Sequence, residues 1–128
     1  MSIPFDAGKG LIIIPTEVEG PSKNVVLRLA LDTGATGTLI NAALLVSIGY
    51  DPALSPERVQ ITTGSGVEYV PRVLTQKVSA LGQDRTGFPV LCHTLPPTSR
   101  IDGLLGLDFF RGQVLTIDFQ QGEIRLNR

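Results

Sequence analysis

Hydrophobic residues occur in short runs along the chain, and several of these runs alternate with polar residues. The alternation is clearest at 59–63 and 67–70, on either side of Gly64-Ser65-Gly66. Successive side chains of a strand point to opposite faces, so this pattern predicts a β-hairpin with a glycine-rich tip. Runs rich in β-branched residues predict further strands at 11–19, 25–31, 73–81, 86–91, 114–119 and 123–126.

Proline and glycine positions refine these strands. Pro15 has no N–H to donate to a sheet, so it predicts an edge or a bulge within 11–19. The strand at 25–31 is mostly apolar, and we expect it to be buried on both faces. Polar and glycine residues at 82–85 and 120–122 predict turns between neighbouring strands.

Two short helices are predicted. Asn41 is suited to be the N-cap of a helix over 42–48, and Gly49 to end it. Residues 101–110 predict a short buried strand followed by one helical turn that Gly112 stops. With about eight strands in total, the fold class is all-β, a closed barrel or sandwich.

Composition excludes several classes of protein but does not identify the function. The 128 residues predict a single domain, 1–128, and 42% hydrophobic with 18% charged residues excludes intrinsic disorder. A net charge of −1 without a basic run gives no support for a nucleic-acid partner. No long apolar stretch and no signal-peptide pattern are present, so we expect no membrane partner in this chain and favour a cytoplasmic location.

The single cysteine, Cys92, rules out an intrachain disulfide, and the single histidine is its neighbour, His93. Adjacent strand residues point to opposite faces, so a Cys–His protease dyad is disfavoured against a buried cysteine and a loop histidine. Asp32, Asp102 and Asp108 have no metal-ligand spacing, and Asp108 is expected to cap the short helix. No metal and no cofactor are expected.

The most informative residue is Asp32, which follows the apolar strand at 25–31 directly and begins Asp-Thr-Gly. An unpaired buried charge costs several kcal/mol, so this carboxylate is either functional or held by hydrogen bonds. Asp32 could simply open a turn. A second apolar-apolar-glycine unit downstream, Leu104-Leu105-Gly106, favours a functional interpretation.

Taken together, these segments resemble the single-domain retroviral-type (retropepsin-like) aspartic proteases over about residues 11–126. Residues 31–36 match the catalytic-loop signature, 61–70 match the flap hairpin, and 104–110 match the segment that crosses behind the catalytic loop. The resemblance implies an aspartic endopeptidase that cuts an extended, apolar peptide or protein substrate. Two carboxylates that share one proton perform this chemistry.

Only Asp32 among the seven aspartates is followed by Thr-Gly, so the second carboxylate is expected from a second chain in a C2 homodimer. By resemblance, Thr33 hydrogen-bonds across the axis and Gly34 contacts the substrate backbone. The substrate-binding residues that the resemblance implies are Ala35, Thr36, Thr63, Gly64, Ser65, Gly66, Leu104 and Leu105.

Departures from the family leave an alternative open. Thr36 stands where viral enzymes usually have an acidic residue, and the side of the hairpin that Tyr69 faces is not defined. The hairpin at 114–126 is a candidate for the sheet that joins two subunits. The alternative function is a non-catalytic peptide-binding or dimerisation module on the same fold, because fold does not fix function.

Overall fold

The computed structural model describes residues 1–127, and ten strands, one α-helix and two 3₁₀ helices lie within them. The strands are β1 (Ser2–Pro4), β2 (Ile13–Glu19), β3 (Asn24–Leu31), β4 (Leu39–Asn41), β5 (Arg58–Thr63), β6 (Gly66–Ala80), β7 (Gln83–His93), β8 (Gly103–Leu105), β9 (Val114–Asp118) and β10 (Glu123–Asn127). The helices are α1 (Ala42–Ser47), η1 (Pro52–Leu54) and η2 (Leu107–Phe110). The all-β prediction is confirmed.

The larger sheet closes on itself. Its strands follow the order β2-β3-β8-β4-β7-β6-β5, and a further pairing of β2 with β6 completes a barrel. β2 pairs with β3 along its whole length but with β6 only from Glu17 to Glu19. Pro15 therefore lies where β2 has a single partner, as its missing N–H predicts.

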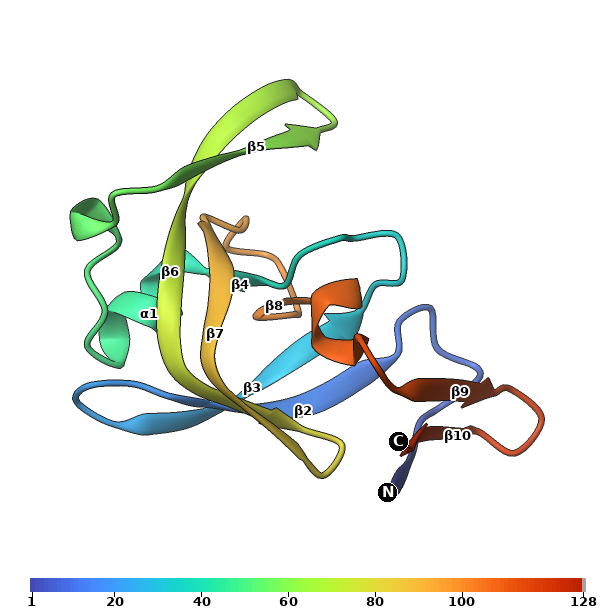
Figure 1. Cartoon of the computed structure of the whole chain (residues 1–128). Coiled ribbons are helices and arrows are strands. Elements are labelled where there is room, and N and C mark those ends of the chain that lie inside the picture. Colours follow the sequence, from blue (N-terminus) through green and yellow to red (C-terminus); the bar gives the residue numbers. More distant parts are fainter. Residues whose placement is uncertain (128) are drawn as a thin grey trace.

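The predicted hairpin is present and projects from the barrel. Beyond its pairing with β7, β6 continues upward and pairs with β5 from Arg58 to Thr63, which places the hairpin above one end of the barrel (Figure 1). A separate sheet of order β1-β10-β9 contains both chain ends and lies at the opposite end of the molecule (Figure 1). The hairpin predicted at 114–126 thus forms with β9 and β10, and β1 pairs with it within the same chain.

The core fills the barrel with aliphatic side chains and three phenylalanines. Phe109 is fully buried and meets Phe88 and Phe110 edge to face. Arg85 donates hydrogen bonds to the Phe109 carbonyl oxygen and lies over its ring, with its guanidinium carbon 5.3 Å from the ring centre. These contacts fix η2 against the barrel, and η2 in turn lies behind the loop that carries Asp32.

Several local predictions are wrong for physical reasons. The strand at 25–31 is not buried on both faces, because Val26 and Arg28 of β3 are exposed while Leu27 and Leu29 are buried. The two strands predicted at 67–70 and 73–81 are one continuous strand, β6.

The turn after β6 and the start of α1 also differ. The turn predicted at 82–85 is formed by Leu81 and Gly82, both with positive φ, and residues from Gln83 onward belong to β7. Asn41 is the N-cap of α1, but its side chain makes no capping hydrogen bond, and the helix ends at Ser47. No helix within 1–127 combines the length and hydropathy needed to cross a membrane.

Candidate active site

A groove of about 600 Å³ lies between the loop that follows β3 and the hairpin of β5 and β6. The loop lines it with Asp32, Gly34, Ala35 and Thr36, and the hairpin lines it with residues 60–63. Apolar side chains from β4, β7, β8 and the segment between β7 and β8 complete the wall, among them Leu39, Leu91, Leu95, Ile101 and Leu104. The groove therefore joins one acidic group to largely apolar surroundings.

Asp32 is partly buried and held by its own backbone and by β8. Its N–H donates to the Leu105 carbonyl oxygen at 3.0 Å, and its carboxylate Oδ1 accepts the Gly34 N–H at 2.9 Å. Its carbonyl oxygen accepts the Ala35 N–H at 3.1 Å, which closes a tight turn. These bonds orient the carboxylate through Oδ1 beside the groove that Asp32 lines.

β8 supports the loop because it runs between the two strands that flank it. β8 is parallel to β3 and antiparallel to β4, so the loop from β3 to β4 passes over the end of β8. A Cβ added to Gly103 would lie 2.0 Å from the Leu39 carbonyl oxygen, and one added to Gly106 would lie 2.7 Å from backbone atoms of Gly37. Glycine is therefore required at both positions by close backbone approach.

Thr38 and Asp108 connect the loop to η2. The fully buried Thr38 hydroxyl donates to Asp108 Oδ1 at 2.7 Å and accepts the Gly106 N–H at 3.1 Å. Asp108 Oδ2 also accepts the Thr38 N–H at 3.1 Å, and the Leu107 N–H donates to the Ala35 carbonyl oxygen at 2.8 Å. The prediction that Asp108 caps the helix is wrong, because Gly106 is the N-cap and Asp108 faces Thr38.

Most of the predicted site residues lie on or beside this groove. Ala35, Thr36, Thr63 and Leu104 line it, together with Asp32 and Gly34. Thr33 is exposed in the same loop, and Gly64, Ser65 and Gly66 form the exposed tip of the hairpin.

Leu105 does not fit its predicted role as a substrate contact. Its side chain is fully buried in the core, because neighbouring residues of β8 point to opposite faces and Leu104 takes the groove side. Leu105 instead receives the Asp32 N–H and packs beneath the loop.

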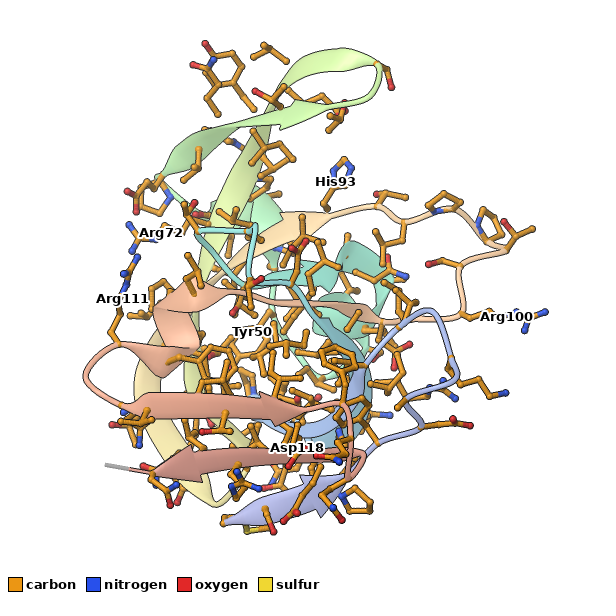
Figure 2. The ribbon with its side chains drawn as sticks, turned by 90° about the vertical axis from the view of Figure 1, so that its right-hand side faces the viewer. Tyr50, Arg72, His93, Arg100, Arg111 and Asp118 are labelled. Atoms are coloured by element: carbon orange, nitrogen blue, oxygen red, sulfur yellow. The ribbon has the colours of Figure 1, made fainter. Side chains whose placement is uncertain are left out.

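His93 is a groove residue that the sequence interpretation assigned to a loop. It ends β7 below the hairpin (Figure 2), and its Nε2 lies 3.7 Å from Glu68 Oε2 on β6. Gln60, Ile61 and Leu91 also line the groove without having been assigned to it. A hairpin that lies over the Asp32 loop turns alternate residues of 59–63 toward that loop, so the period-two pattern contains a signal for Ile61. The parallel pairing of β4 with β7, which brings Leu91 and His93 to the groove, has no such signal in the local sequence.

Cys92 lies on the other face of β7 from His93, as adjacent strand residues must. Its side chain is 4% exposed, and burial raises the pKa of the thiol while the positive charge of Arg58 opposes that rise. A raised pKa keeps the sulfur protonated at neutral pH, which suits a packed side chain and not a nucleophile.

Comparisons of sequence and of structure show which known proteins this chain is similar to. A sequence model of the aspartyl protease family matches residues 14–109. A retropepsin-like aspartic protease from Rickettsia conorii superposes with a TM-score of 0.74 at 20% identity, covering 99% of this chain and 89% of that one. The retroviral protease-like domain of Ddi1 from Leishmania major gives 0.55 at 17% identity, covering 92% and 94%. No curated protein matches the sequence.

Proposed function

The chain belongs to the aspartyl protease family, and from that premise we propose that it is an aspartic endopeptidase whose site forms from two copies of a single domain, 1–128. The observation that carries the proposal is the position of Asp32: a partly buried carboxylate at a strand end, oriented by the Gly34 N–H and open to an apolar groove. The geometry suits a group that must exchange protons with a bound peptide.

A second carboxylate is required by the chemistry. One carboxylate removes a proton from water while the water oxygen attacks the peptide carbonyl, and a protonated carboxyl group donates to the carbonyl oxygen. Collapse of the resulting diol breaks the C–N bond, and the departing nitrogen receives a proton. Among the described residues that line the groove, Asp32 has the only carboxylate. We therefore assign the other carboxylate to Asp32 of a second copy.

The remaining predicted residues take supporting roles in this proposal. Thr33, exposed beside Asp32, would hydrogen-bond across the two-fold axis, and Gly34 would contact the substrate backbone. The β5–β6 hairpin, with Gly64, Ser65 and Gly66 at its tip, would close over an extended peptide as a flap. Apolar substrate side chains are favoured because Ile61, Leu91 and similar residues face the groove.

The first experiment compares the wild type with Asp32→Asn on a mixed peptide library between about pH 4 and pH 7. Asparagine keeps the shape of the side chain but cannot act as a base or an acid, so cleavage should fall by about 10²–10⁴-fold. Asp84→Asn is the matched control, because Asp84 is exposed on β7 and lies outside the groove. Equal cleavage by wild type and Asp32→Asn would refute the assignment of the site.

The second experiment tests whether two copies share the dyad. Wild type is mixed with a roughly tenfold excess of Asp32→Asn under conditions where subunits exchange. Random pairing should then lower activity to about a tenth, since few wild-type chains find a wild-type partner. Activity that does not change would contradict a shared dyad. If neither protein cleaves any peptide but both bind peptides, the non-catalytic module is the better assignment.

A further inference from the structure

A second groove, of about 390 Å³, lies between the loop after β1 and the segment before β8. Its wall includes the apolar side chains of Phe5, Leu11 and Ile13. We call it the cationic groove because it is also lined by three cationic side chains, Lys9, Arg28 and Arg100.

The cationic groove carries more positive than negative charge, because three cationic side chains and one acidic side chain line it. All three side chains belong to exposed residues, and among the ion pairs within residues 1–127 none includes them. Asp6 is the one acidic residue of the lining, and its Oδ1 accepts the N–H of Gly8. The nearby Asp102 carboxylate likewise accepts the backbone N–H of Arg28, at 2.7 Å. An anion entering this groove would meet cations not committed to another partner.

The cationic groove adjoins the groove that holds Asp32, with one lining residue common to both. Ile101 lines both, and Arg100 precedes it in the chain. Arg28 lies four residues before Asp32 on β3, a distance of about 13 Å along a strand at roughly 3.3 Å per residue. An extended peptide rises by about the same amount per residue, so a peptide that left the Asp32 groove past Ile101 would cover this distance in about four residues.

Figure 2 places Arg100 on the outside of the connection that leads into β8, next to the N-terminal loop in that view, and Arg111 on the other side of the molecule. Arg100 and Lys9 come from two different loops, while Arg28 comes from the sheet. Guanidinium groups bind carboxylates through paired, charge-assisted hydrogen bonds, which makes two arginines a suitable receptor for an acidic side chain.

We propose that the cationic groove is a subsite for an acidic side chain of the bound peptide, about four residues from the cleaved bond. The inference rests on the proposed function, because it takes Asp32 as the point of cleavage. The subsite would add a preference for charge to a groove whose other walls are apolar. A preferred substrate would then carry apolar residues near the cleaved bond and an acidic residue further along the peptide.

The test uses a peptide that the wild type cleaves, with Glu, Gln or Lys placed at one position at a time, two to five residues to either side of the bond. We expect kcat/KM to be about tenfold higher for Glu than for Gln at one position near the fourth, and this ratio to fall as salt is added. Arg100→Gln should bring the ratio close to one, and Arg100→Glu should make Lys the preferred residue there. Arg111→Gln, which removes an exposed arginine outside both grooves, should retain the wild-type ratio.

The outcomes separate this inference from the proposed function. Cleavage with no preference for Glu at any position overturns the acidic subsite and leaves the peptidase intact. If no peptide is cleaved, the peptidase fails, and binding of the labelled Glu and Gln peptides decides the subsite: tighter binding of Glu that Arg100→Gln abolishes supports it, and equal binding overturns it. If Arg100→Gln instead changes the sedimentation of the protein, the groove is an interface between copies and the inference is overturned.

Discussion

The hydroxyl of Thr38 lies at the centre of the contacts behind the Asp32 loop, and its removal tests how that loop is held. The hydroxyl donates to Asp108 Oδ1 at 2.7 Å and accepts the Gly106 N–H at 3.1 Å, and the residue is fully buried. Thr38→Val replaces the hydroxyl by a methyl group of similar size. The change therefore removes two hydrogen bonds without opening a cavity.

The expected cost follows from the burial of the two partners. The Gly106 N–H is buried and loses its acceptor, which costs about 1–3 kcal/mol. The hydrogen bond to Asp108 involves a charge, but this carboxylate is only partly buried and can bind water instead, so its loss is discounted. We expect Thr38→Val to lower the free energy of unfolding by about 2–4 kcal/mol.

Thr38→Ser is the matched control, because it keeps the hydroxyl and removes a buried methyl group worth about 1 kcal/mol. Urea unfolding measures both variants, with an unchanged slope showing that the midpoint reports stability alone. Amide hydrogen exchange provides a local readout: Leu107, whose N–H donates to the Ala35 carbonyl oxygen, should lose protection in Thr38→Val. If Thr38→Val proves as stable as Thr38→Ser, the hydroxyl does not hold the loop.

Three further predictions concern packing and ionisation. Gly106→Ala should cost at least about 2–4 kcal/mol and reduce cleavage, because its Cβ meets backbone at 2.7 Å, whereas Gly10→Ala, with nothing within 4 Å, should change urea stability little. Tyr50→Phe should cost about 1–3 kcal/mol at neutral pH, since the hydroxyl donates to the Glu19 carbonyl oxygen and accepts a backbone N–H. Burial raises the pKa of Tyr50 above 10.0, so the wild type loses the stability that this hydroxyl contributes as pH rises through the pKa of the folded protein. The urea midpoints of the wild type and Tyr50→Phe should therefore converge at that pH, and a difference between the midpoints that stays constant with pH would contradict the reasoning. The protonated, buried Cys92 should react with a thiol reagent only as fast as the protein unfolds, and rapid labelling of the native protein would refute this.

Features carried by short stretches of sequence could be predicted. The polar loop after an apolar strand located Asp32, alternation located the β5–β6 hairpin, and the apolar-glycine pattern at 101–110 predicted β8 and η2 in the right order. Each of these signals lies within about ten residues. Over that length, the spacing of apolar residues and the positions of glycine decide the local structure.

Features that depend on distant partners could not be predicted. Thr38 and Asp108 are 70 residues apart in the chain, and neither carries a local signal of their hydrogen bond. β4 has three residues and forms because β7 and β8 flank it. The turn at Leu81 requires a positive φ that leucine disfavours, so the pairing of β6 with β7 imposes it against local preference.

The Asp32 loop forms the floor of the groove and the β5–β6 hairpin forms its roof, and the two differ in how firmly they are held. The floor is anchored to β8 and η2 by the bonds from Asp32, Gly106 and Leu107, and a shift would expose buried backbone. Within residues 1–127, the backbone of the roof beyond Val70 pairs only within the hairpin, residues 64–69 are all exposed, and the one ion pair to the barrel joins Glu68 to His93 at 3.7 Å. Local opening is cheapest where few apolar contacts are lost, so we expect the hairpin to open more readily than the Asp32 loop. The proposed endopeptidase would need such a roof, because a segment within a longer polypeptide has no free end to thread into a groove.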